Sequence, residues 1–158
     1  MSRSNCKILD TGDNFPKLTF GSVEGGVITL PDDFDSRWNI LLFYRGHWLI
    51  FCRQQLLDFQ KHMKDFAKKN IQVIAASADP WEKALQTVER YRLTLRIGHS
   101  LNPPEMSALT GAFYNAQENY LHATGFILGP DGKVENAVYS SRSIGRLVAQ
   151  DCLDFIGL

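Results

Sequence analysis

One segment, residues 39–56, constrains the fold of this chain more than any other. It starts as a continuous apolar run that ends at Tyr44, and after a short bend it continues with helical spacing from Cys52. A strand that is apolar on both faces is typical of the interior of a covered sheet. A helix N-terminus carries partial positive charge and unpaired N–H groups, which stabilise a thiolate, the reactive form of cysteine. We therefore expect a buried strand that delivers one cysteine to the first turn of a helix.

The patterns around this segment predict a mixed α/β sheet. Apolar residues recur at helical spacing over 52–69, and residues 71–76 form a second buried run. A crossover helix between two buried strands implies that the strands pair in parallel. Further elements are expected as a hairpin around Gly25-Gly26, helices over 79–92, 103–113 and 143–155, a short strand over 93–97, and a hairpin of 124–128 with 133–139. The expected fold has three layers, a mixed central sheet with helices on both faces.

Length and charge limit the class of protein. The 158 residues suit one domain, 1–158, with a real core. Lys plus Arg (17) balances Asp plus Glu (17), so the chain offers no basic field for nucleic acid or an anionic membrane. No apolar run approaches the ~20 residues that a membrane span needs, and residues 1–20 lack the apolar block of a signal peptide. We therefore expect a cytoplasmic protein.

The cysteines and histidines are too scattered for a metal site or a disulfide framework. None of Cys6, Cys52 and Cys152 has the two-residue spacing to another cysteine that is typical of zinc and dithiol sites. The four histidines show no ligand spacing either: His47, His62, His99 and His122. Cys152 lies on the apolar face of the last predicted helix, which favours core packing. We expect no metal, no cofactor and no intramolecular disulfide in the resting protein.

Several stretches agree with one family in order and spacing. Residues 12–18 read Gly-Asp-Asn-Phe-Pro-Lys-Leu, and Phe43-Tyr44 precedes Cys52 by eight positions. Residues 76–79 fit the end of the strand that follows the first crossover helix, and residues 126–134 fit a late hairpin. These features resemble the peroxiredoxins, the alkyl hydroperoxide reductase and thiol-specific antioxidant family of the thioredoxin-like superfamily. Their opening is Gly-Asp-x-x-Pro-x-Leu and their peroxidatic loop is Phe-Tyr-Pro-x-x-x-Thr-x-x-Cys. The resemblance covers nearly the whole chain.

A small subfamily is similar in two further stretches. Residues 45–53 read Arg-Gly-His-Trp-Leu-Ile-Phe-Cys-Arg against its Arg-Gly-x-Trp-Cys-Pro-x-Cys-Arg, and residues 139–147 contain its Ile-Gly-Arg-Leu. The departures are specific. Leu49 replaces the first cysteine of the subfamily and the threonine of peroxiredoxins, Arg45 stands at the peroxiredoxin proline, and Ala123 stands near their late arginine. The resemblance implies a thioredoxin-like fold, a peroxide substrate and an external thiol reductant. A homodimer is one candidate assembly, and the sequence leaves the oligomeric state open.

The single loop cysteine restricts the chemistry that remains. Dithiol exchange needs a second thiol, and Leu49 excludes that mechanism in the loop. Peroxide reduction needs one thiolate, which becomes a sulfenic acid that another thiol resolves. Cys6 is an alternative source of that thiol within the chain. Leucine cannot replace the hydrogen bond of a threonine hydroxyl, and the loss of one such bond typically costs ~10²–10³-fold in rate.

The resemblance and the loop together assign candidate roles. Cys52 is the candidate catalytic residue, and the candidates for lining its pocket or stabilising its thiolate are Arg45, Trp48, Leu49, Arg53 and His122. Arg142 and Arg146 are expected to cap or pair near the last helix without a catalytic role.

Two functions from different classes remain open. One is a weak one-cysteine thiol peroxidase with an antioxidant role. The other is a catalytically degenerate thioredoxin-fold module that binds a partner or small molecule in the former redox pocket, with Cys52 as a small buried hydrophobe. A third interpretation is that the first cysteine has been replaced in this chain.

Overall fold

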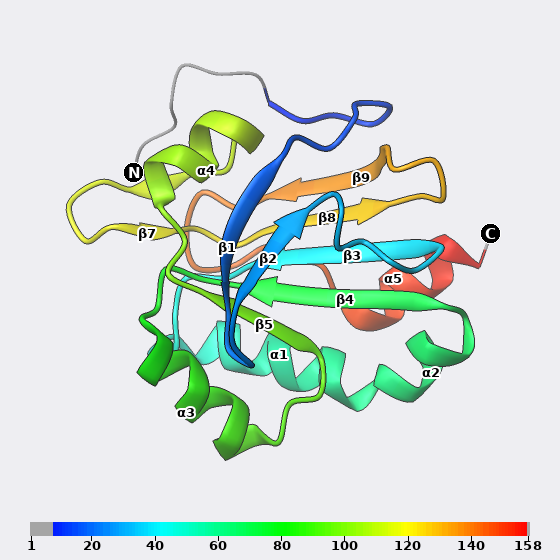
Figure 1. Ribbon diagram of the computed structural model, residues 1–158. Coiled ribbons are helices and arrows are strands. Elements are labelled where there is room, and N and C mark those ends of the chain that lie inside the picture. Colours follow the sequence, from blue (N-terminus) through cyan, green and yellow to red (C-terminus); the bar gives the residue numbers. More distant parts are fainter. Residues whose placement is uncertain (1–7, 158) are drawn as a thin grey trace.

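The structure is a computed structural model that describes residues 8–157. A seven-stranded mixed sheet forms its centre. The strand order is β2-β1-β5-β4-β3-β8-β9 (Figure 1). The strands are β1 Leu18–Ser22, β2 Val27–Leu30, β3 Trp38–Phe43, β4 Ile71–Ala76, β5 Arg96–His99, β8 Thr124–Leu128 and β9 Val134–Tyr139. β4 pairs in parallel with both β3 and β5, and the other neighbours are antiparallel. The predicted α/β class with a mixed sheet is confirmed.

The pairing of β3 with β4 positions the rest of the sheet. Trp38 aligns with Ile71 and Phe43 aligns with Ala76, so the two strands are in parallel register over their whole lengths. Side chains alternate between the faces of a strand. Ile40 and Leu42 therefore belong to one apolar cluster, whereas their neighbours along β3 belong to the other. Burial on both faces explains why the apolar run is continuous, and the predicted parallel pair is confirmed.

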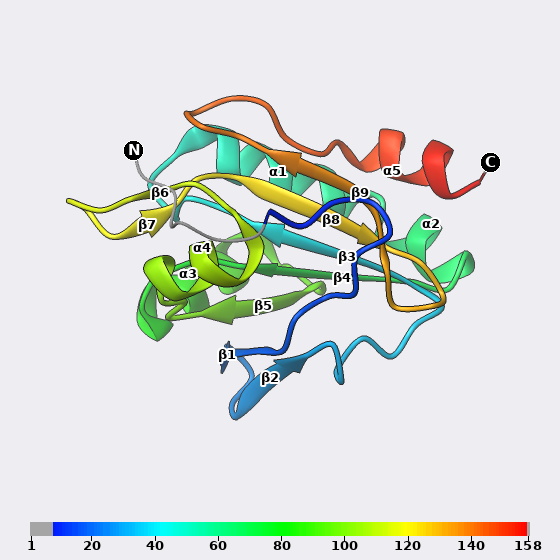
Figure 2. The same cartoon turned by 90° about the horizontal axis from the view of Figure 1, so that it is seen from above.

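Helices cover both faces of the sheet. They are α1 Ile50–Lys61, α2 Met63–Lys68, α3 Trp81–Tyr91, α4 Pro103–Thr110 and α5 Ala149–Ile156. Leu56 of α1, Ala84 of α3 and Leu153 of α5 share one apolar cluster, while Met106 of α4 lies in the cluster on the other face. Figure 2 shows α1 and α5 together on one side of the strands, away from the β1–β2 hairpin. Within residues 8–157, no helix has the length and apolar character needed to cross a membrane.

The helix predicted over 52–69 is in fact two helices with a break at His62. The backbone N–H of His62 donates to the carbonyl of Phe59, three residues back, at 3.1 Å. The carbonyl of Asp58, four residues back, lies instead 2.9 Å from Nδ1 of the His62 ring. A side chain that takes the place of a backbone hydrogen bond competes with the helix. α1 therefore ends at Lys61, and α2 begins at Met63.

The prediction of a last helix over 143–155 is wrong at its start, because α5 begins only at Ala149. Residues 140–148, here called the strap, follow β9 without regular structure. The Ser140 hydroxyl lies within hydrogen-bonding reach of the carbonyls of Arg142 and Ile144, which stabilises a turn in place of a helix. Gly145 has φ +91°, a conformation that glycine adopts without the strain of a Cβ.

Two polar side chains of α1, the buried Gln55 and the partly exposed Asp58, fasten the strap and the start of α5. Nε2 of Gln55 donates to the carbonyl of Leu147 at 3.0 Å. The backbone N–H of Ala149 donates to Oδ2 of Asp58 at 2.8 Å, so a carboxylate of α1 accepts from the first turn of α5. These bonds hold the strap across the beginning of α1, where Cys52 lies.

Smaller differences concern the middle of the chain. β5 lies slightly beyond the expected strand over 93–97, and α4 ends at Thr110 because Gly111 turns the chain with φ +88°. A two-stranded hairpin of β6 Tyr114–Asn115 with β7 Tyr120–Leu121 was not predicted. Strands of two residues carry no readable alternation, yet this hairpin brings Tyr120 to the site described next.

Candidate active site

Cys52 occupies the third position of α1, in the first turn, as predicted. Leu49 precedes the helix, and its carbonyl accepts the backbone N–H groups of Cys52 at 3.1 Å and Arg53 at 3.2 Å. Cys52 is fully buried, so its sulfur has no access to solvent in this structure. The neighbouring loop and the strap cover it.

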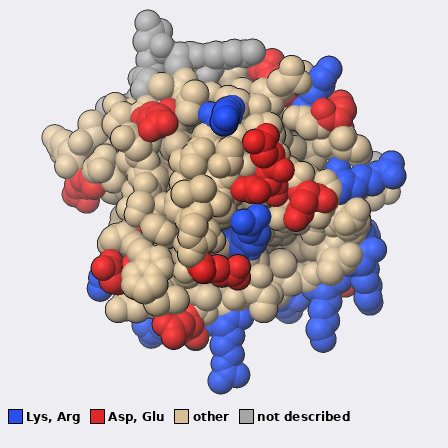
Figure 3. Space-filling view, in the orientation of Figure 1, with Lys and Arg blue, Asp and Glu red and all other residues tan. Residues whose placement is uncertain are grey.

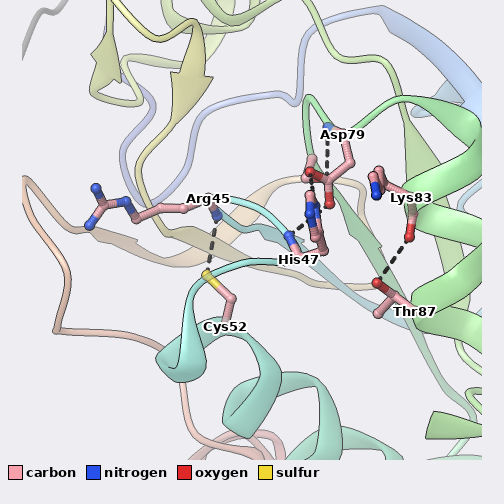
Figure 4. A network of polar contacts seen from close by, with 7 residues as sticks. Arg45, His47, Cys52, Asp79, Lys83 and Thr87 are labelled. Atoms are coloured by element: carbon pink, nitrogen blue, oxygen red, sulfur yellow. Dashed lines mark hydrogen bonds and ion pairs between the residues drawn. The ribbon is translucent and has the colours of Figure 1, made fainter. Parts of the chain in front are cut away.

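Two N–H donors converge on the Cys52 sulfur, one from the preceding loop and one from the strap. The backbone N–H of Arg45 lies 3.3 Å from Sγ, and Figure 4 shows this contact. Nη1 of Arg146, on the strap, lies 3.4 Å from the same atom. A guanidinium and an amide N–H aimed at sulfur both stabilise negative charge there. The arrangement therefore suits a thiolate better than an apolar packing position would.

Arg146 is the site residue that sequence reasoning placed elsewhere. It was expected to pair near the last helix, whereas it lies in the irregular strap and reaches the sulfur across the fold. Nη2 of its guanidinium donates to the carbonyl of Ser143 at 2.8 Å, which holds the planar group in position. The sequence signal that could have identified it is the Ile-Gly-Arg-Leu stretch at residues 144–147.

Arg45 contributes its backbone to the sulfur, and its guanidinium points away (Figure 4). Nη1 donates to the Ser143 hydroxyl at 2.7 Å, and Nη2 donates to the Tyr120 hydroxyl. The cation also lies over two aromatic rings, 4.7 Å from the centroid of Tyr120 and 5.3 Å from that of Trp48. The side chain that was expected to neutralise the thiolate instead joins the loop, the strap and the β6–β7 hairpin.

Trp48 and Leu49 take different positions in the loop. Trp48 is 46% exposed and packs edge-on against Tyr120, with 5.1 Å between ring centroids. The partly buried Leu49 side chain packs against the apolar cluster that contains Cys52. Arg45, Trp48 and Tyr120 share a pocket of about 250 Å³, whose other lining residues include His47, Asp79, Glu118 and Asn119. Trp48 lines this pocket, but Cys52 is not among the lining residues, so the expected role of Trp48 in a pocket of Cys52 stays a prediction.

Arg53 does not join Cys52. It lines a separate hollow between α1 and α3, together with Lys83 and Arg90. Among the described residues, no hydrogen bond links Arg53 to the sulfur. The expectation that Arg53 supports the thiolate directly is therefore not met by the geometry, because successive residues of a helix point about 100° apart.

His122 is buried, and its ring lies edge-on to Tyr120 with 5.5 Å between centroids. Burial, followed by the nearby positive charge of Arg45, lowers the pKa of His122 from 6.5 to about 4. The imidazole is therefore neutral near pH 7 and supplies no positive charge. Within residues 8–157, no hydrogen bond joins it to Cys52, so the structure does not bring this candidate to the sulfur.

An unpredicted pair, His47 with Asp79, holds the loop that leads into α1. Oδ2 of Asp79 accepts the backbone N–H of His47 at 2.9 Å, and Oδ1 lies 3.0 Å from Nδ1 of its ring. Asp79 lies in the segment that follows β4 and is buried, so the pair ties the end of one central strand to the loop after the other (Figure 4). In the part of the chain that the structure describes, no cluster of three or more metal-ligating side chains occurs.

The other cysteines differ from Cys52. Cys152 of α5 is buried, and its pKa is raised to about 12 by burial and, less strongly, by Asp151 and Asp58. This environment agrees with the packing role expected for it. Cys52 and Cys152 are both free thiols. Cys6 lies outside the described residues, so its role as an alternative resolving thiol stays a prediction.

Comparisons with known proteins point to one family. The model of the AhpC/TSA family matches residues 11–137. The peroxiredoxin of Thermotoga petrophila is 26% identical over 142 residues, which are 85% of this chain and 65% of that protein. The peroxiredoxin of Thermotoga maritima is 27% identical over 143 residues, which are also 85% of this chain and 65% of that protein. The chain thus spans about two thirds of the length of these curated relatives.

Solved structures show the same fold. Peroxidoxin BcpB of Mycobacterium tuberculosis has a TM-score of 0.80 at 18% identity, covering 94% of this chain and 97% of that one. AhpC of Enterococcus faecalis also has a TM-score of 0.80, at 16% identity, covering 96% and 92%. The predicted thioredoxin-like, peroxiredoxin-type fold is therefore confirmed.

The lowered pKa of His122 predicts a pH dependence of stability. Between about pH 6.5 and pH 4 the unfolded chain binds a proton that the folded chain does not, so stability falls as pH falls through this window. We expect the urea midpoint to drop between about pH 7 and pH 5, and to drop less in His122→Gln. Between about pH 7 and pH 8 the two proteins should show the same small change. If the urea midpoint drops equally on acidification in the unmodified protein and in His122→Gln, the lowered pKa assigned to His122 is contradicted.

Proposed function

The chain belongs to the AhpC/TSA family, and on that premise we propose that it is a thiol-dependent peroxidase whose attacking group is Cys52. The observation that carries the proposal is the placement of the Cys52 sulfur between the backbone N–H of Arg45 and the guanidinium of Arg146. The substrate is a peroxide, and the electrons come from an external thiol. In this proposal the protein acts as an antioxidant oxidoreductase.

The reaction uses one cysteine of the site. The Cys52 thiolate attacks one peroxide oxygen, the S–O bond forms, the O–O bond breaks, and the other oxygen leaves with a proton as water or an alcohol. The sulfur is oxidised to sulfenic acid while the peroxide is reduced. An external thiol then condenses with the sulfenic acid and releases water, and a second thiol frees Cys52 from the mixed disulfide. Cys152 takes no part because it is buried in an apolar cluster and its pKa is raised to about 12.

Access of the peroxide requires a movement, because the sulfur is fully buried. The strap is the segment whose displacement would uncover it, since Arg146 is its contact with the sulfur. Ile144 and Val148 of the strap are 69% and 46% exposed, so little apolar packing holds these side chains down. We infer that the strap opens to admit substrate and that its polar bonds to α1 close it again.

The sealed sulfur also favours a second candidate, a binding module without turnover. In that case Cys52 packs as a small hydrophobe, and the pocket of Arg45, Trp48 and Tyr120 holds a partner or small molecule. The two candidates differ in one respect that can be measured, which is the reactivity of Cys52. The guanidinium on its sulfur favours the peroxidase, because a packed neutral thiol needs no cation.

The proposed function is tested by peroxide consumption with an external dithiol as reductant. We expect the unmodified protein to consume hydrogen peroxide slowly but catalytically, and Cys52→Ser to lose this activity to background. Cys152→Ser is the matched control, because it removes another buried thiol with no donor on its sulfur among the described residues, and it should retain the activity. Equal rates for the unmodified protein and Cys52→Ser would support the binding module instead.

Leu49 is expected to limit the rate. Leu49→Thr introduces a hydroxyl where peroxiredoxins have threonine, and a donor that acts in the transition state is typically worth ~10²–10³-fold. We therefore expect Leu49→Thr to raise the rate constant for the reaction with hydrogen peroxide, measured by stopped-flow fluorescence. Leu49→Val, which changes shape without adding a donor, should not. A rate that is the same in all three proteins would show that position 49 does not touch the chemistry.

A further inference from the structure

A small hollow lies between the beginning of α1 and one face of α3. Its volume is about 80 Å³, and it is lined by His47, Arg53, Lys83, Gln86, Thr87, Arg90 and Tyr91. Because positions three and four apart share a face of a helix, the α3 residues at 83, 86, 87 and 90 form one continuous surface toward the hollow. The space is sufficient for several waters or for one compact ligand group.

The lining is cationic and holds no carboxylate. Arg53, Lys83 and Arg90 carry permanent positive charge, and none of them forms an ion pair with a carboxylate among residues 8–157. The acidic residues of α3, Glu82 and Glu89, are exposed and do not line the hollow. Figure 3 shows Lys and Arg side chains projecting along the lower edge of the molecule, with Asp and Glu side chains among them at the left, over α3. Cations gathered around an unneutralised hollow repel one another, and an anion between them would remove that cost.

One donor of the lining residue Arg53 is already withdrawn from water. Nε of Arg53 is buried and has no hydrogen-bond partner in the structure. A buried donor that lacks a partner is costly. His47 lies on the side of its loop that faces α3, where Asp79 fixes the ring, while the Arg45 side chain extends in the opposite direction (Figure 4). The hollow is therefore a formed feature, with an arginine on α1 facing the basic side of α3.

We propose that this hollow binds a tetrahedral oxyanion of the phosphate class, either free or carried on a small molecule. The guanidinium groups of Arg53 and Arg90 supply paired N–H donors that match oxyanion geometry, and Lys83 adds a third positive charge. The proposal goes beyond the peroxidase and does not depend on Cys52 being reactive. Because Arg53 directly follows Cys52, the bound anion would lie beside the first turn of the helix that carries the sulfur.

The test is calorimetric titration of the reduced full chain with inorganic phosphate at low ionic strength. We expect saturable binding of one phosphate, weakened at least tenfold in Arg53→Gln and in Arg90→Gln, because each removes a charge-assisted donor. Lys64→Gln, which removes an exposed cation on α2 away from the hollow, should bind as the unmodified protein does. Arg90 is itself exposed, so Arg90→Gln tests the site even if Arg53→Gln disturbs the fold.

A second titration with phenyl phosphate separates the two sources of the anion. Binding at least as tight as that of inorganic phosphate would identify a phosphate carried on a larger molecule, and binding of inorganic phosphate alone would identify the free ion. Absence of saturable binding, or equal weakening by Lys64→Gln and Arg90→Gln, would overturn the proposal. Neither result would bear on the peroxidase, since no step of the titration involves Cys52.

Discussion

Two hydrogen bonds to one sulfur connect the distant parts of this structure. The donors to Cys52 come from the loop after β3 and from the strap after β9, at residues 45 and 146. The guanidinium of Arg45 binds Ser143 of the strap, and Gln55 of α1 binds the carbonyl of Leu147. The guanidinium donor to the sulfur therefore depends on the position of the strap, whereas the amide donor belongs to the loop. The contacts that favour negative charge on the sulfur are also the contacts that bury it.

Cys152 is a second buried cysteine with which the surroundings of Cys52 can be compared. Cys52 and Cys152 are equally free and equally buried, and both lie on helices that pack on the same face of the sheet. Burial and, less strongly, the carboxylates of Asp151 and Asp58 raise the pKa of Cys152 to about 12, which keeps it a neutral thiol. Cys52 has an amide N–H and a guanidinium within 3.4 Å. Placing a partly buried guanidinium against a sulfur costs solvation free energy, which a negative charge on that sulfur offsets.

Sequence patterns predicted the parts of the fold that local chemistry specifies. The apolar run of β3 and the helical spacing after it placed Cys52 in a first turn, because burial on both faces leaves a direct trace in the sequence. The sequence pattern of the strap was misleading, because the spacing of Ile144 and Val148 predicts the buried face of a helix although both side chains are exposed. The contact of Arg146 with Cys52 joins residues 94 apart, and no local pattern encodes such a distance.

The role of Arg146 is the most direct test of the site. We propose measuring the rate constant for the reaction of reduced protein with hydrogen peroxide by stopped flow in Arg146→Gln, with Arg142→Gln, an exposed arginine of the same strap, as control. Loss of a charge-assisted donor predicts a rate at least tenfold lower in Arg146→Gln and unchanged in Arg142→Gln. A rate in Arg146→Gln equal to or above that of the unmodified protein would mean that Arg146 only covers the sulfur, and would contradict the proposed active site.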